Sequence, residues 1–131
     1  MSASAHAAPV LVIDDDPMNL ELAVALLEPD GYAVRTATTA ERGLELAALE
    51  QPAVILMDLH FATGMSGYDA TRRLKADPLT AGIPVVALTA LVQRQAEQAA
   101  RDAGFDAYVT KPLDATTLRE TVRRFVTGAS G

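Results

Sequence analysis

The stretch VLVIDDDPMN, residues 10–19, changes abruptly from apolar to acidic side chains. Four apolar residues are followed by Asp14, Asp15 and Asp16, and then by Pro17. The apolar run predicts a buried strand, and Asp16 before Pro17 is typical of a helix N-cap and the first helical residue. Crowded carboxylates at the end of a buried strand repel one another, and burying them is costly unless positive charge is near. The stretch therefore predicts a strand followed by a helix, with carboxylates that either cap the helix in water or hold a cation.

The composition describes one globular domain with acidic character. The chain has 131 residues, of which 50% are apolar and 21% are charged, so it is long enough to bury a core and is not of the disordered class. The formal net charge is −6, which argues against a general nucleic-acid binder because such proteins are basic. We expect a domain at residues 9–127, with flexible tails at residues 1–8 and 128–131.

Residue types that are rare or missing exclude several other classes of protein. The apolar runs are too short to span a membrane, and the N-terminus lacks the features of a secretory signal. The sequence contains no cysteine, so it has no disulfide framework, as expected for a cytoplasmic protein. His6 and His60 are the only histidines, so a histidine-rich zinc site is excluded. We therefore expect a cytoplasmic protein that binds neither membrane nor nucleic acid.

Strand-like and helix-like segments alternate along the domain. Strands are predicted at residues 10–14, 32–36, 53–58, 84–89 and 106–110. Thr38 and Glu41 have the spacing of a capping box that begins the second helix. Ser66 and Asp114 are the predicted N-caps of a helix at about residues 67–76 and of the last helix. The helix after residue 89 is predicted from an apolar stripe of Val92, Ala96, Ala99 and Ala103.

This alternation predicts an α/β fold with a parallel sheet, and the burial patterns of the strands predict its order. The first, third and fourth strands are nearly continuous apolar runs, as expected for strands covered on both faces. The second strand alternates around Arg35, and the fifth is short and carries Tyr108, so both suit the sheet edges. With right-handed crossovers the order becomes 2-1-3-4-5, a flavodoxin-like, doubly wound sheet with helices on both faces. Ligands bind such sheets beside the carboxyl ends of the strands, at the switch point between strands one and three.

Polar side chains are predicted to gather at this edge of the sheet. Asp14 and Asp15 follow the first strand, Asp58 ends the third, Thr89 ends the fourth, and Lys111 follows the fifth. Carboxylate oxygens suit Mg²⁺, which keeps several waters and takes few protein carboxylates. A carboxylate nucleophile, an ammonium group and a hydroxyl donor also form a set suited to phosphoryl transfer. The sequence therefore predicts a Mg²⁺-dependent phosphoryl site in which Asp58 is the nucleophile.

With these residues in this order, the chain resembles the receiver domains of two-component response regulators, and in particular the single-domain members. The resemblance covers residues 9–127. It rests on the acidic cluster after the first strand, on Asp58, on ALTA at residues 87–90 and on AGFDAYVTKP at residues 103–112. It implies that Asp58 accepts a phosphoryl group from a phosphohistidine donor, that Asp14 and Asp15 bind Mg²⁺, and that Lys111 contacts the phosphoryl group.

The resemblance has further implications for the switch and the partners. Thr89 and Tyr108 would be the switch pair, and the Lys111-Pro112 bond is similar to one that is cis in the family. The partners would be a histidine kinase or histidine phosphotransfer protein and a downstream protein target. The protein would be a monomer or weak dimer. It would not be an enzyme, except that it catalyses its own aspartyl phosphorylation and dephosphorylation.

One departure from the family pattern lies in the loop after Asp58. The family loop usually carries Met-Pro and reaches a glycine eight positions after the phosphoacceptor. Here the loop reads LHFATGMSG, without proline, and Gly67 is nine positions after Asp58, so one residue is inserted. The insertion bears on the path of the loop and on the backbone carbonyl near His60 that is expected to complete the metal site.

Other functions remain compatible with parts of the pattern. In a haloacid-dehalogenase-type phosphatase, Asp14 and Asp16 would form the Asp-x-Asp motif, although Met18 stands where that motif has a small Thr or Val and the chain has no room for a cap domain. A receiver-like module could dock partners without being phosphorylated, and the chain could be a receiver from a larger kinase. In the simplest interpretation the three aspartates only cap a helix, which we expect for Asp16 alone.

Overall fold

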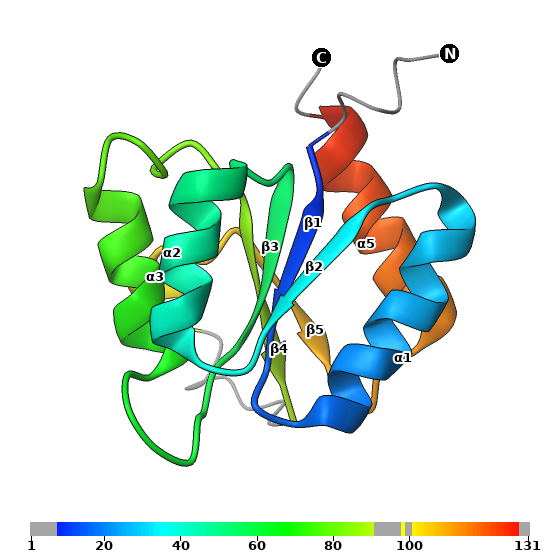
Figure 1. Ribbon diagram of the computed structural model, residues 1–131, viewed down its shortest axis with the longest axis horizontal. Helices are drawn as coiled ribbons and strands as arrows, with labels where there is room; N and C mark the ends of the chain where they lie inside the picture. The colour runs from blue at the N-terminus through cyan, green and yellow to red at the C-terminus, as the bar shows by residue number, and fades with distance from the viewer. Residues whose placement is uncertain (1–7, 91–97, 99–100, 129–131) are drawn as a thin grey trace.

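Five parallel strands form one sheet in the order β2-β1-β3-β4-β5, which confirms the predicted topology (Figure 1). The computed structural model describes residues 8–90, 98 and 101–128. The strands are β1 Val10–Ile13, β2 Val34–Ala37, β3 Val54–Asp58, β4 Val85–Thr89 and β5 Ala107–Thr110. The helices are α1 Pro17–Leu27, α2 Ala40–Glu50, α3 Gly67–Ala76 and α5 Ala115–Gly128, with a 3₁₀ turn at Glu28–Asp30 after α1.

The element ends differ from the predictions by one or two residues. Strand β2 begins at Val34, where pairing with Val10 of β1 begins, two residues later than predicted. Helix α5 continues through Gly128, one residue past the predicted end of the domain. Most of the helix that we predicted after residue 89 lies outside the described residues. The described part of its apolar stripe is Ala103, which is buried.

The sheet is covered on both faces, because successive strand residues point to opposite sides. In β1, Leu11 and Ile13 pack into the core beneath α2 and α3, whereas Val10 and Val12 pack into the core beneath α1 and α5. Figure 1 shows these two helix pairs on opposite sides of the sheet. All four residues of β1 are fully buried, so the continuous apolar run is explained by this two-sided cover.

Side-chain oxygens cap the helices close to where the sequence predicted. Asp16 accepts a hydrogen bond from the Met18 amide and caps α1, while Ser66 and Asp114 cap α3 and α5. The predicted capping box of Thr38 and Glu41 is wrong. Thr39 is the N-cap of α2 and accepts from the Arg42 amide, because the helix begins one residue later than that spacing implied. Glu41 is therefore not used to close the helix start.

The first residue of α3, Gly67, lies very close to the end of β3. Its amide donates to the carbonyl of Leu59 at 3.0 Å, and a Cβ at this position would overlap the backbone carbonyl oxygen of Asp58. We expect Gly67→Ala to lower the free energy of unfolding by about 3 kcal/mol, the upper end for overpacking, because backbone must move. Chemical denaturation of purified protein measures this change.

Gly82 provides the matched control for this substitution. A Cβ at Gly82 would meet no atom within 4 Å, so Gly82→Ala is expected to change stability by less than about 0.5 kcal/mol. If the two alanine variants unfold at the same denaturant concentration, the loop does not need the close approach at Gly67.

None of the helices in the described part of the chain is both long enough and apolar enough to cross a membrane.

Candidate functional site

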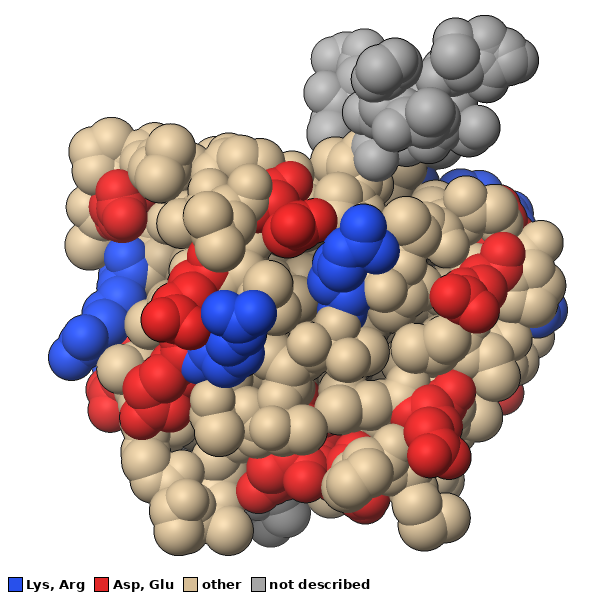
Figure 2. All heavy atoms as spheres, in the orientation of Figure 1, with Lys and Arg blue, Asp and Glu red and all other residues tan. Residues whose placement is uncertain are grey.

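The carboxyl ends of the strands bring the predicted polar residues together. Asp14 follows β1, Asp58 ends β3, Thr89 ends β4 and Lys111 follows β5. Because β1 and β3 are neighbours, Asp14 and Asp58 flank the switch point of the sheet. In Figure 2 acidic side chains gather along the lower edge of the molecule, where Figure 1 shows the strands ending. The predicted edge is therefore the edge at which the polar side chains meet.

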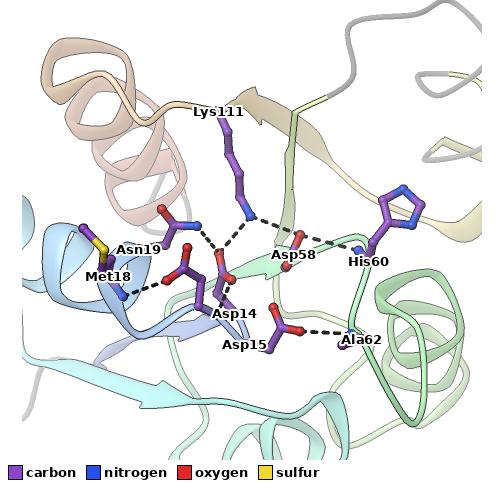
Figure 3. Close-up of polar contacts among 9 residues, drawn as sticks. Asp14, Asp15, Met18, Asn19, Asp58, His60, Ala62 and Lys111 are labelled. Atoms are coloured by element: carbon purple, nitrogen blue, oxygen red, sulfur yellow. Dashed lines mark hydrogen bonds and ion pairs between the residues drawn. The ribbon is translucent and has the colours of Figure 1, made fainter.

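Lys111 joins the two buried carboxylates. Its Nζ lies 3.0 Å from Oδ2 of Asp14 and 3.2 Å from Oδ1 of Asp58. Figure 3 shows the lysine side chain reaching between the two aspartates. The exposed fraction is 0% for Asp14 and 7% for Asp58, so both charges are held away from water. One ammonium group thus faces two desolvated carboxylates.

Asp14 has further partners that orient its carboxylate. Its Oδ1 accepts from the Asp16 amide at 2.9 Å, and its Oδ2 accepts from the side-chain amide of Asn19 at 3.2 Å (Figure 3). Asn19 was missed by the sequence analysis. The available signal was a polar residue in the first turn of α1, beside the apolar Leu20, where its side chain can turn back toward the strand end.

Asp15 and Asp16, which follow Asp14 in the sequence, have different hydrogen-bond partners. Asp15 is exposed, and its Oδ2 accepts from the backbone amide of Ala62 at 3.0 Å, in the loop after β3. Asp16 directs Oδ1 to the Met18 amide at 2.9 Å and caps α1, as predicted. The structure therefore brings Asp14 and Asp15 to the site together with Asp58, while Asp16 is occupied at the helix start.

The ionisation of the site follows from burial and neighbouring charge. Burial and the nearby Asp14 carboxylate raise the pKa of Asp58 above its ordinary value, against the opposing effect of Lys111. Burial by itself would lower the pKa of Lys111, but its contacts with Asp14 and Asp58 raise it. Lys111 therefore stays protonated near neutral pH, while an ionised Asp58 is less favourable here than in water.

The raised pKa of Asp58 predicts how the stability of the fold depends on pH when no divalent cation is present. The folded state binds the Asp58 proton more tightly than the unfolded chain does. The stabilising contribution is therefore complete below the ordinary aspartate pKa of 3.8 and is lost as pH rises through the raised pKa of folded Asp58. An asparagine at position 58 has no carboxyl group to ionise, so this loss of stability does not occur in Asp58→Asn. We expect the variant to have the same free energy of unfolding as the wild type at low pH and a higher one at neutral pH.

Denaturant titrations at several pH values in chelator-treated buffer measure this difference. Asp69→Asn, which removes an exposed carboxylate paired with Arg72, is the control and should stay parallel to the wild type. A wild type that gains stability over Asp58→Asn as pH rises would contradict the raised pKa.

The donor set of the cluster fits a hard divalent cation. Asp14, Asp15 and Asp58 each offer a carboxylate oxygen, and these oxygens lie within 4.8 Å of one another. Three carboxylates facing one ammonium group leave an excess of negative charge, which a cation would offset. Oxygen ligands of this type, with room for water on the exposed Asp15 side, suit Mg²⁺.

The loop at residues 59–66 turns back toward the cluster. The His60 amide donates to Asp58 Oδ1 at 3.4 Å, and its imidazole ring points away from the carboxylates (Figure 3). The ring lies edge-on to Tyr68 instead. The predicted metal-ligand role of the His60 carbonyl stays a prediction. The ring itself is a loop contact and is not turned toward the site.

Thr89 and Tyr108 lie on neighbouring strands at the same edge. Thr89 is buried, and its carbonyl accepts from the Lys111 amide at 2.7 Å, which ties the end of β4 to the residue after β5. Tyr108 pairs in register with Ala87 and is 40% exposed. The two predicted switch residues therefore lie on the last two strands of the sheet, with Tyr108 on the edge strand β5.

A family model described as the response regulator receiver domain matches residues 10–123. Protein PilH of Pseudomonas aeruginosa is 36% identical over 119 residues, which cover 91% of this chain and 98% of PilH. A putative response regulator from Chloroflexus aurantiacus has a similar structure, with a TM-score of 0.86, 29% identity, and coverage of 92% of this chain and 98% of that one. The receiver domain of sensor histidine kinase PA1611 from Pseudomonas aeruginosa, with magnesium coordinated in its active-site cleft, has a TM-score of 0.84, 26% identity and the same coverage.

Proposed function

Because this chain belongs to the response regulator receiver domain family, it is a phosphorylatable receiver of two-component signalling, and we propose that Asp58 is its phosphoacceptor. The observation that carries this proposal is the position of Lys111, whose Nζ lies within 3.2 Å of an oxygen of Asp58 and 3.0 Å of one of Asp14. A buried carboxylate beside a fixed ammonium group can accept a phosphoryl group whose charge the lysine then neutralises. Receiver domains are signalling modules, and we propose that this one catalyses only its own phosphorylation and dephosphorylation.

In the proposed reaction a carboxylate oxygen of Asp58 attacks the phosphorus of a phosphohistidine. A P–O bond forms, the P–N bond breaks, and its electron pair leaves with the imidazole. Lys111 balances the charge on the phosphoryl oxygens, and the Thr89 hydroxyl donates a hydrogen bond to one of them. Asp14, Asp15 and Asp58 would hold Mg²⁺, which when bound would supply further positive charge for the phosphoryl oxygens.

Incubation with acetyl phosphate and Mg²⁺, followed by intact mass measurement, tests this function. The wild-type protein should gain the mass of one phosphoryl group, and chelation of Mg²⁺ should prevent the gain. If the protein gains no mass with acetyl phosphate or with a phosphorylated histidine phosphotransfer protein, the proposed function is wrong. The alternative of a receiver-like module that docks partners without being phosphorylated would then hold.

The phosphatase alternative is disfavoured by the positions of the aspartates. It requires Asp14 and Asp16 to act together as an Asp-x-Asp pair. Asp16 instead accepts from the Met18 amide. The carboxylate that shares Lys111 with Asp14 is the buried Asp58.

We further propose that phosphorylation is read by partner proteins through Thr89 and Tyr108. The phosphoryl group adds about −1.5 to −2 charges and strong acceptor oxygens. Thr89 can follow one of these oxygens, and Tyr108 on the neighbouring strand can then change its position. A histidine kinase or phosphotransfer protein would supply the phosphoryl group, and a downstream protein would bind the altered face.

Three further expectations stay predictions. They are the cytoplasmic location, the monomeric or weakly dimeric state, and the domain limits at residues 9 and 127.

Thr89→Ala is expected to keep phosphorylation at a reduced rate and to lose the conformational response. Amide NMR spectra with and without beryllofluoride measure that response. In the wild type, amide shifts should change from about residue 91 through β5 to Leu118 of α5. Most of the helix predicted at residues 91–102 lies outside the described residues. Wild-type spectra that stay unchanged over residues 91–118 would refute this switch.

A further inference from the structure

Two carboxylates from outside the loop at residues 59–66 hold its backbone. Asp15 accepts from the Ala62 amide at 3.0 Å, and Glu41 of α2 accepts from the Met65 amide at 3.1 Å through Oε2. The base of the loop is closed by the hydrogen bond from the Gly67 amide to the Leu59 carbonyl. The loop that carries one inserted residue is therefore fixed near its middle and near its end by two separate acidic side chains.

Thr39, and not Thr38, caps α2, so Glu41 lies at the second position of the helix and its carboxylate contacts the loop instead. Glu41 lies in the first turn of the helix, where the exposed backbone amides favour a negative charge. Hydrogen bonds from its own backbone amide and from the Met65 amide lower the pKa of Glu41, so it is ionised near neutral pH. A charged acceptor makes a stronger hydrogen bond to an amide than a neutral one does.

Gly64 shows that the loop packs closely on this carboxylate. Its φ of +79° lies in the left-handed region, which favours glycine. A Cβ at Gly64 would also lie 2.9 Å from Oε2 of Glu41, closer than real Cβ atoms approach other atoms. The backbone conformation and the missing side chain of Gly64 together allow the Met65 amide to reach Glu41.

We propose that Glu41 is a positioning residue for Mg²⁺ binding and phosphorylation at Asp58, and that it acts through the loop at residues 59–66. This inference rests on the function proposed above. Asp15 is one of the three carboxylates of the cluster and also holds the Ala62 amide, so the path of the loop and the orientation of Asp15 are set together. When Glu41 is removed, the Met65 amide loses its charged acceptor and the end of the loop is released. The Ala62 amide and the carbonyls near His60 are then held less well against the cluster.

The test compares Glu41→Ala and Glu41→Gln with Glu45→Ala. Glu45 lies on the same helix, but its carboxylate pairs with Arg42 at 3.1 Å, so its removal changes the charge of α2 without touching the loop contact. Mg²⁺ affinity is measured by titration calorimetry with MgCl₂. Hydrogen exchange of the Met65 and Ala62 amides is measured by NMR in Mg²⁺-free buffer, and the labelling rate is measured with acetyl phosphate.

We expect Glu41→Ala to bind Mg²⁺ about tenfold more weakly, the size of effect seen for residues that orient metal ligands, and to exchange the Met65 amide faster. Glu41→Gln, whose amide oxygen can still accept from Met65, should recover part of both losses, and Glu45→Ala should match the wild type. All four proteins should unfold cooperatively, since both glutamates are exposed.

Several outcomes would overturn the inference. If Glu41→Ala binds Mg²⁺ and is labelled like the wild type, Glu41 has no positioning role. If Glu45→Ala loses as much affinity, the effect is one of overall charge and not of the loop contact. If the wild type itself neither binds Mg²⁺ nor accepts a phosphoryl group, the proposed function fails, and this inference fails with it.

Discussion

Asp58→Asn should abolish phosphorylation of this protein by acetyl phosphate and by a phosphohistidine donor. The amide is neutral and is not a nucleophile, yet it has nearly the shape of the carboxylate, so Lys111 and the surrounding core should keep their positions. Near the site, Asp14 is tied to Lys111 and Asn19, and Asp16 is tied to the Met18 amide, so neither is expected to replace Asp58 as the acceptor. Intact mass measurement with excess donor and Mg²⁺ detects the loss.

Asp69→Asn is the control for this experiment. It removes an exposed carboxylate that pairs with Arg72 on the surface of α3, and it should be labelled like the wild type. Full labelling of Asp58→Asn at another residue, located by peptide mapping, would disprove the assignment of the phosphoacceptor.

Asp15→Ala should weaken Mg²⁺ binding by at least about tenfold, whereas Asp16→Ala should leave it nearly unchanged. Although the two residues are adjacent in the sequence, Asp15 lies in the carboxylate cluster and Asp16 caps α1. The cost of Asp16→Ala should appear in the free energy of unfolding instead, as a loss of about 1 kcal/mol typical of a missing N-cap. Titration calorimetry and chemical denaturation of both variants separate the two effects.

The two variants act as controls for each other because each removes one negative charge from neighbouring positions. Equal losses of Mg²⁺ affinity would mean that the ion responds to the summed charge of residues 14–16 and not to particular ligands. Affinity lost only in Asp16→Ala would place the cation on the helix side of the cluster, away from Asp58.

The fold and most of the site could be predicted from the sequence because the signals that define them are local. Strands covered on both faces appear in the sequence as continuous apolar runs, as in β1. The starts of helices are marked by N-cap residues such as Asp16, Ser66 and Asp114. Once the parallel order was inferred, the carboxyl ends of the strands had to lie at one edge. Asp14, Asp58, Thr89 and Lys111 could therefore be placed together although they are far apart in the chain.

The capping box at Thr38 and Glu41 shows where a local signal failed. Ser/Thr followed three residues later by Glu predicts that the glutamate returns to the helix start. Thr39 offers an equally good hydroxyl one position on, and the helix begins after it. Local spacing therefore favoured Thr38, whereas the N-cap is Thr39, because the helix start also depends on where β2 ends and how α2 packs on the sheet.

What only the tertiary structure decided is the contact of the loop at residues 59–66 with distant side chains. Ala62 donates to Asp15 across 47 positions of the sequence, and Met65 donates to Glu41 across 24. These bonds use backbone amides, which every residue except proline carries, so no side-chain pattern marks them. The sequence by itself determined the fold and which polar side chains share one edge of the sheet. Only the packed chain decided that Asp15 and Glu41 also hold the loop, because that depends on the path by which the loop returns to Gly67.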